Sequence, residues 1–252
     1  MYNPELVFGV VDANALPILV LAGAAMVANY VWFFLAFRAA NRDGVYSIPL
    51  ICTFYWFAHD VSLLARYELW FDHYGHWFMM LWWVAFIPAV LFELAFLVQA
   101  VRLVRAELFP DWSRAAVGGL LAAGVLTAGV VWEGVKYIFA DDLYLLGFGL
   151  TIVSYPVFGV GLLLRRGSAL GQTPGMWIAY LVTAVGYFAV SAGWFGPAFH
   201  AWQWFGLAAL SVLGGVAMTF AVHRLRRDLG TGTRSPHPQR PTPPTATPVP
   251  RG

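Results

Sequence analysis

The sequence has little charge for its length. Only 11% of its 252 residues are charged, whereas 60% are hydrophobic. A soluble globular domain carries roughly 25% charged residues and roughly 45–50% apolar ones. A soluble fold of this size could not bury so much apolar surface and keep so little charge outside. We therefore predict an integral membrane protein whose apolar surface is covered by lipid.

Other kinds of residue are also scarce. The single cysteine, Cys52, excludes a disulfide scaffold, and the formal net charge of +2 is too small to indicate a nucleic-acid partner. No aspartate-rich Asp-Asp-x-x-Asp element lies in a predicted helix, and the neighbouring acids Asp141 and Asp142 fall in a connector. We therefore expect no metal and no cofactor. Lys136 is the only lysine among many arginines, a bias that suggests a GC-rich bacterial genome and hence a bacterial cytoplasmic membrane.

Long hydrophobic runs are abundant. A bilayer core of about 30 Å needs about 20 mostly apolar residues per helix. Seven stretches qualify and predict an all-α polytopic protein with seven transmembrane helices, at 15–38, 46–70, 77–104, 115–139, 143–164, 174–194 and 200–223. The connectors are short, so residues 1–228 are predicted to form one membrane domain. Residues 229–252, rich in Pro and Thr, are predicted to be a disordered tail.

The arginines fall on alternate connectors. They flank the first, third and fifth connectors and follow the last helix, at Arg38, Arg42, Arg102, Arg105, Arg114, Arg165, Arg166, Arg224, Arg226 and Arg227. The remaining connectors carry acidic residues and histidines or no charge. By the positive-inside rule, the arginine-bearing connectors lie in the cytoplasm. The N-terminus is then outside and the C-terminus inside.

Three carboxyl groups lie within the predicted spans, at Asp60, Glu93 and Glu133. An ionisable side chain at the centre of a membrane helix costs at least ~2.5–3.5 kcal/mol, so each is a candidate functional residue. Asp60 is either a helix-packing residue paired with a neighbouring helix or an acid that apolar surroundings keep protonated, able to donate a proton. Glu93, alone on an apolar face, is expected to be protonated or paired.

The neighbours of these acids give further expectations. His59 precedes Asp60, but successive helix residues point about 100° apart, so the two are not expected to share one narrow face. Glu133 and Lys136 are at i, i+3, which predicts either an ion pair at the membrane rim or a role in a site.

Aromatic residues make up 17% of the chain and include twelve tryptophans. An interfacial aromatic belt accounts for those near the predicted outer helix ends, Trp70, Trp77, Trp132, Trp194, Trp202 and Trp204. Trp56, Trp82 and Trp83 lie deeper, as do Phe54, Tyr55 and Phe57. Aromatic faces stabilise cations, so an acid at the same depth would suit proton-initiated cyclisation of an isoprenoid chain.

The second predicted helix resembles a known family. The run Arg42-Asp43-Gly44-Val45-Tyr46-Ser47-Ile48-Pro49-Leu50, followed by Phe57-Ala58-His59-Asp60, is similar to the integral-membrane terpene cyclases. These are seven-helix enzymes of fungal meroterpenoid and paxilline-type pathways, with actinobacterial relatives. Asp43 and Tyr46 match the family's basic-Asp-x-x-Tyr turn, Phe57 and Ala58 match the helix that follows, and Asn29-Tyr30 looks like its Asn-Tyr pair.

The resemblance implies roles for these residues. Asp60 takes the place of the glutamate that is the family's proposed catalytic acid, and His59 replaces a tryptophan. The family carries a second catalytic aspartate in the last helix, whereas residues 200–223 have no carboxylate here. Either Glu133 or Glu93 then supplies the second acid, or Asp60 acts with His59 alone. The side chains expected to contact the substrate are His59, Trp56, Tyr55, Trp82, Trp83, Trp132 and Asn29.

The leading hypothesis is therefore a membrane terpene cyclase that protonates a farnesyl- or geranylgeranyl-type chain. Its expected partners are a hydrophobic prenylated small molecule and the bilayer. Four alternatives stay open. One is a non-enzymatic seven-helix transporter or sensor with an intramembrane proton relay, and another is a different membrane isoprenoid or sterol isomerase. The third is a carotenoid isomerase, and the fourth is a relative of the cyclases with altered or lost activity. The sequence leaves the oligomeric state open.

Overall fold

The structure, a computed structural model, describes residues 2–230, the last three through their backbone alone. Every regular element in that range is helical, which confirms the predicted all-α class. Six helices are long and apolar enough to cross a membrane, which indicates an integral membrane protein. They are α2 (Ala15–Asp43), α4 (Trp77–Leu108), α5 (Arg114–Phe139), α6 (Leu145–Arg166), α7 (Pro174–Trp194) and α8 (Trp202–Gly230).

The second predicted span is shorter than expected. Helix α3 covers Leu50–Ala65, and its 16 residues reach only about 24 Å at 1.5 Å per residue. The α-helix ends at Ala65, with Arg66 as its C-cap, and the chain then forms a π-helix over Leu69–Tyr74. The expectation of one helix over 46–70 is therefore wrong.

Both ends of α3 have a local cause. Pro49 precedes its first residue, and a proline disfavours helical backbone in the residue before it. At the other end, the indole N–H of Trp70 donates to the carbonyl of Leu63 at 2.7 Å, and that of Trp83 donates to Leu64 at 3.0 Å. If α3 continued, these two carbonyls would instead accept hydrogen bonds from backbone N–H groups of its next turn.

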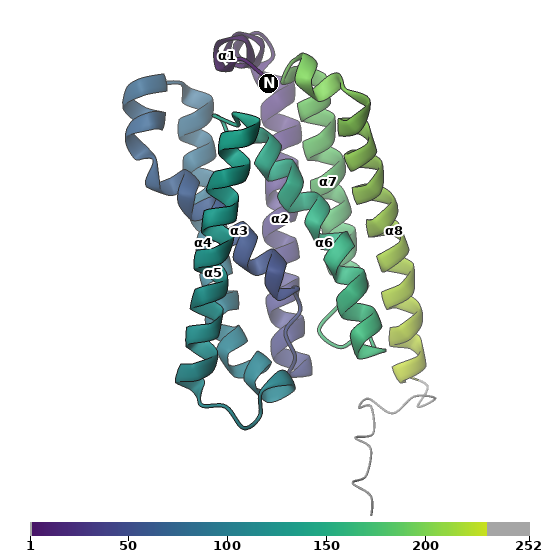
Figure 1. Cartoon of the computed structure of the whole chain (residues 1–252). Helices are drawn as coiled ribbons and strands as arrows, with labels where there is room; N and C mark the ends of the chain where they lie inside the picture. Colours follow the sequence, from purple (N-terminus) through teal and green to yellow (C-terminus); the bar gives the residue numbers. More distant parts are fainter. Residues whose placement is uncertain (1, 231–252) are drawn as a thin grey trace, which may run out of the picture.

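Helix α3 lies inside the bundle, where it packs against α4, α5 and α6 (Figure 1). Helix α2 packs mainly against α7 and also contacts α4, and α8 covers α6 and α7. The outward faces of the long helices are apolar, with Leu126, Val130 and Phe220 all more than 70% exposed. Such faces are suited to contact with lipid chains.

A short helix, α1 (Pro4–Ala13), lies at the end of the bundle where α2 begins (Figure 1). Trp77 donates to the Asp12 carboxylate at 2.7 Å, and the Tyr2 hydroxyl donates to Asp141 at 2.5 Å. Asp141 in turn accepts from the backbone N–H groups of Leu146 and Gly147, at 3.1 and 2.6 Å, in the first turn of α6. A carboxylate is favourable there because the first N–H groups of a helix lack partners.

Arginine side chains tie together the opposite end of the bundle. Asp43, before the left-handed C-cap Gly44 of α2, accepts from Arg226 of α8 and from the backbone N–H of Gly171 at 2.8 Å. Nearby, Arg165 and Arg166 hold the Glu107 carboxylate at 2.6 and 2.8 Å, and Arg165 also donates to the Tyr46 hydroxyl at 2.5 Å. Asp43 and Tyr46 therefore join helices at this end of the molecule.

One further expectation needs correction. The tryptophans expected in a belt are not all interfacial, because Trp70 and Trp132 are fully buried and Trp204 is 4% exposed. Trp202, at 78%, is the exposed member of that set. Helix α8 ends at Gly230, close to the predicted boundary after Asp228. The rest of the predicted tail lies outside the described residues.

Candidate active site

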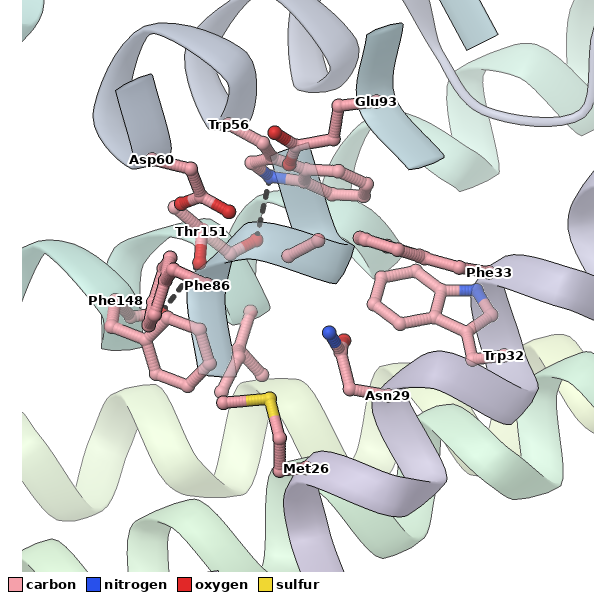
Figure 2. Close-up of a pocket in the computed structure, with 12 residues that line it drawn as sticks. Met26, Asn29, Trp32, Phe33, Trp56, Asp60, Phe86, Glu93, Phe148 and Thr151 are labelled. Atoms are coloured by element: carbon pink, nitrogen blue, oxygen red, sulfur yellow. Dashed lines mark hydrogen bonds between the residues drawn. The ribbon is translucent and has the colours of Figure 1, made fainter. Parts of the chain in front are cut away.

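Two of the three predicted intramembrane acids meet inside the bundle. Asp60, on α3, is 5% exposed, and Glu93, on α4, is 1% exposed. Their carboxyl groups point into one cavity, which we call the acid cavity, and lie close enough to interact (Figure 2). One oxygen of Glu93, Oε2, has no hydrogen-bond partner within residues 2–230. The helices thus bring two carboxyl groups together where water is largely excluded.

His59 is joined to Asp60, contrary to expectation. Its Nδ1 lies 2.6 Å from Asp60 Oδ1. Successive side chains leave the helix about 100° apart, but those of His59 and Asp60 are long enough to bend toward each other. The His59 ring is fully buried and packs against Trp132 and Tyr144, with ring centroids 4.5 and 5.4 Å apart. Its Nε2 has no hydrogen-bond partner in the described part of the chain.

Aromatic rings form much of the acid cavity wall. They come from α2, α3, α4 and α6 and are Trp32, Phe33, Trp56, Phe86 and Phe148. Trp56 is fixed in place, since its indole N–H lies 3.0 Å from the Thr151 carbonyl (Figure 2) and 2.9 Å from the Ser154 hydroxyl. Asn29 projects into the same cavity. The cavity therefore combines acidic groups with π faces.

Several of these wall residues escaped the sequence-based prediction: Met26, Trp32, Phe33, Phe86, Phe148 and Thr151. Helical spacing was the available signal for some of them. Phe86 and Ala89 precede Glu93 by seven and four residues and therefore share its helix face, and Trp32 and Phe33 follow Asn29 by three and four. The residues on α6 had no such signal, because only the packing of α6 against α3 brings them to the cavity.

The other predicted substrate-contacting residues do not line the acid cavity. Trp132 packs on His59, and Tyr55 meets Trp132 at 5.8 Å between ring centroids. Trp82 lines a neighbouring gap that it shares with Phe148. Trp83 donates its N–H to Leu64 and packs edge-on against Tyr67, at 5.7 Å between centroids.

Glu133 lies apart from the acid cavity. Its side chain is 48% exposed and pairs with Arg66 at 2.7 Å, and it also accepts from Ser62 at 2.5 Å. Lys136, the expected partner, lies instead over the ring of Tyr144, with Nζ 5.3 Å from the centroid. The structure thus brings Asp60 to Glu93 and leaves Glu133 in a surface ion pair.

The acid cavity is small, with a volume of about 20 Å³. That is room for about one water molecule. Two larger apolar grooves open nearby on the outside of the bundle. One, of about 810 Å³, lies between α3, α5 and α6, and the other, of about 250 Å³, lies between α2 and α4. Access of a larger molecule to the acids requires side chains between a groove and the cavity to move.

Within residues 2–230, no group of three or more His, Cys, Asp or Glu side chains is arranged to hold a metal ion. No protein-family model, curated protein or solved structure significantly matches this chain.

Proposed function

We propose that this protein is a membrane-embedded terpene cyclase that starts cyclisation of a prenyl chain by protonation. The observation that supports this most is the meeting of Asp60 and Glu93 in a buried cavity walled by aromatic rings. Two buried like charges are costly, so the pair would retain a proton between its carboxyl groups. A carboxylic acid kept protonated at neutral pH is able to act as a general acid.

In the proposed reaction, Asp60 gives its proton to the terminal alkene or epoxide of a farnesyl- or geranylgeranyl-type chain. The alkene π electrons form the new C–H bond, or the epoxide C–O bond breaks to leave a hydroxyl, and a carbocation results. Ring closure moves the cation along the chain until a neighbouring C–H proton leaves to the Glu93 carboxylate. Transfer of that proton from Glu93 to Asp60 restores the acid, so the net reaction is an isomerisation.

The surrounding residues support these steps. The faces of Trp56, Trp32 and Phe148 offer negative π density to a passing cation. His59, bonded to Asp60 at 2.6 Å, orients the carboxyl group. On this proposal Glu93 supplies the second acid that the last helix lacks, and Glu133 has no part in the chemistry.

We further propose that α3, although short, acts as a seventh membrane segment, with its polar ends reached by water. The N-terminus is then outside and the arginine-rich end in the cytoplasm of a bacterium. The clustering of Arg165, Arg166 and Arg226 at one end of the bundle, with Glu107 and Asp43, supports this orientation.

A second candidate is an intramembrane proton relay in a transporter or sensor. The linked His59 and Asp60, with Glu93 beside them, favour it, because adjoining titratable groups are able to pass protons. The two candidates differ in an observable way: a relay moves protons without any prenyl substrate.

The test uses the full chain in membranes, supplied with farnesylated and geranylgeranylated phenols and their terminal epoxides. Asp60→Asn is expected to lower cyclisation by 10²–10⁴-fold, the usual contribution of general acid catalysis. Helix content and thermal stability should stay near wild type, because the amide has the shape of the acid. Full activity in this variant would refute the assignment. Proton uptake by substrate-free proteoliposomes, lost in the same variant, would instead establish the relay.

A further inference from the structure

The groove between α2 and α4 continues toward the acid cavity. We call it the α2–α4 groove; its volume is about 250 Å³ and its walls are apolar, formed mainly by Ile18, Ala22, Met26, Phe78, Trp82 and Ala85. Met26 lines both the groove and the acid cavity. A gap of about 10 Å³ adjoins both, because it shares Met26 and Trp82 with the groove and Met26 and Phe148 with the acid cavity. A single layer of side chains thus separates the groove from the acids.

The two sides of the acid cavity differ in how firmly they are held. On the side of the larger groove between α3, α5 and α6, Trp56 is held by two hydrogen bonds to α6, one of them to Ser154, which lines that groove. Toward the α2–α4 groove, the wall is the unbranched thioether chain of Met26, seen beside Asn29 in Figure 2. Methionine has three rotatable side-chain bonds and adapts its shape easily. The wall on the α2 side is therefore the easier one to displace.

Tyr30, which lines the α2–α4 groove, makes a fixed contact between its two helices. The Tyr30 hydroxyl of α2 donates to the backbone carbonyl of Ala85 on α4. The walls of the α2–α4 groove are therefore mainly apolar. They include the fixed side chain of Tyr30 and, toward the acids, the adaptable side chain of Met26.

We propose that the α2–α4 groove binds the apolar chain of the prenyl substrate, which enters from the bilayer and reaches Asp60 and Glu93 when the Met26 side chain swings aside. This inference rests on the proposed cyclase function and adds the binding site and the route. The occupant is a branched prenyl chain, because the groove adjoins the acid cavity through Met26, and a phospholipid acyl chain is the competing source of the same apolar contacts.

Gly23 allows a direct test. It lies in the groove wall, and nothing lies within 4 Å of the position that a Cβ atom would take there. Gly23→Trp should fill the groove without disturbing the helix packing, and Gly23→Leu is a milder version. Gly161, on the exposed face of α6, has the same free space and lines none of the cavities described above, so Gly161→Trp is the matched control.

The experiment labels the full chain in nanodiscs with a diazirine-bearing farnesol and maps the attachment sites by mass spectrometry. In wild type, label is expected on the α2 and α4 residues of the groove. It should fall at least tenfold in Gly23→Trp, fall partly in Gly23→Leu, and stay unchanged in Gly161→Trp. Asp60→Asn should keep the label, because it alters the acid and not the groove.

Three results would overturn the groove assignment. The first is label on the wall of the α3–α5–α6 groove in place of α2 and α4. The second is equal competition by added phospholipid and by unlabelled farnesol, which would mean a lipid site. The third is unchanged labelling in Gly23→Trp. Labelling of the groove as expected, together with full turnover in Asp60→Asn, would leave the groove standing and refute the proposed chemistry.

Discussion

Gly147 gives a quantitative test of how tightly the acid site is packed. It lies in the first turn of α6, facing α5 and α3. A methyl group there would overlap the ring of Trp132 and lie 3.0 Å from Cδ2 of His59. Trp132 is fully buried and packs against His59, Tyr144 and Tyr55, so its ring has no free space into which to retreat. Gly147→Ala should therefore push apart the side chains that hold His59.

The expected cost follows from this overlap. Overpacking a well-packed core costs about 1–3 kcal/mol. Gly161→Ala, also in α6 but with open space around the new methyl, serves as the control. Because both substitutions change glycine to alanine in one helix, the helix-propensity gain largely cancels in the comparison. At roughly 2–4 °C per kcal/mol for a chain of this size, Gly147→Ala should melt roughly 2–12 °C below Gly161→Ala.

The assay is thermal unfolding of the purified variants in the same detergent, followed by far-UV circular dichroism, with cyclisation measured in parallel. Near-UV circular dichroism should change in Gly147→Ala, since the environment of Trp132 shifts. Equal melting temperatures for the two variants, with an unchanged near-UV spectrum, would show that α6 does not press on Trp132 and His59 as described.

Two further outcomes are expected. Glu133→Gln should change stability by only about 0–1 kcal/mol and leave cyclisation intact, because the Arg66 pair is half-exposed; a loss of activity like that of Asp60→Asn would place Glu133 in the chemistry after all. The bond donated by Trp77 lowers the pKa of Asp12, so this contact stabilises α1 above pH about 4 and weakens as pH falls through the lowered pKa. Hydrogen exchange in α1, corrected for intrinsic rates, should rise over that range in wild type and be insensitive to it in Asp12→Asn.

Much of the helical architecture could be predicted from hydrophobic length alone. The stretches beginning at residues 77, 115 and 174 start within a residue of α4, α5 and α7, because a membrane helix must satisfy its backbone internally over a fixed thickness. The break after α3 could not be read in this way. It depends on Trp70 and Trp83, which donate to carbonyls at the end of α3 only once the chain has turned back.

The candidate site was predictable in its acids and less so in its geometry. Asp60 and Glu93 stood out because charge is rare within apolar spans, and the structure places them in one cavity. Which acid joins Asp60 depended on helix rotation and packing, which place Glu93 inside and Glu133 beside Arg66. Trp132 was expected both at the interface and near the substrate. Its burial against His59 follows from the packing of α5 on α3.

The shortness of α3 has a consequence for how the membrane stays sealed. Ser62, two residues beyond Asp60, already belongs to the polar cluster with Glu133 and Tyr144, so bulk water and the acid cavity are separated by roughly one helical turn. The rings of Trp132 and Tyr144 pack against His59, whose side chain is fully buried. On the proposed function, these rings shield the acids from water on this side, and proton exchange with that side requires them to move.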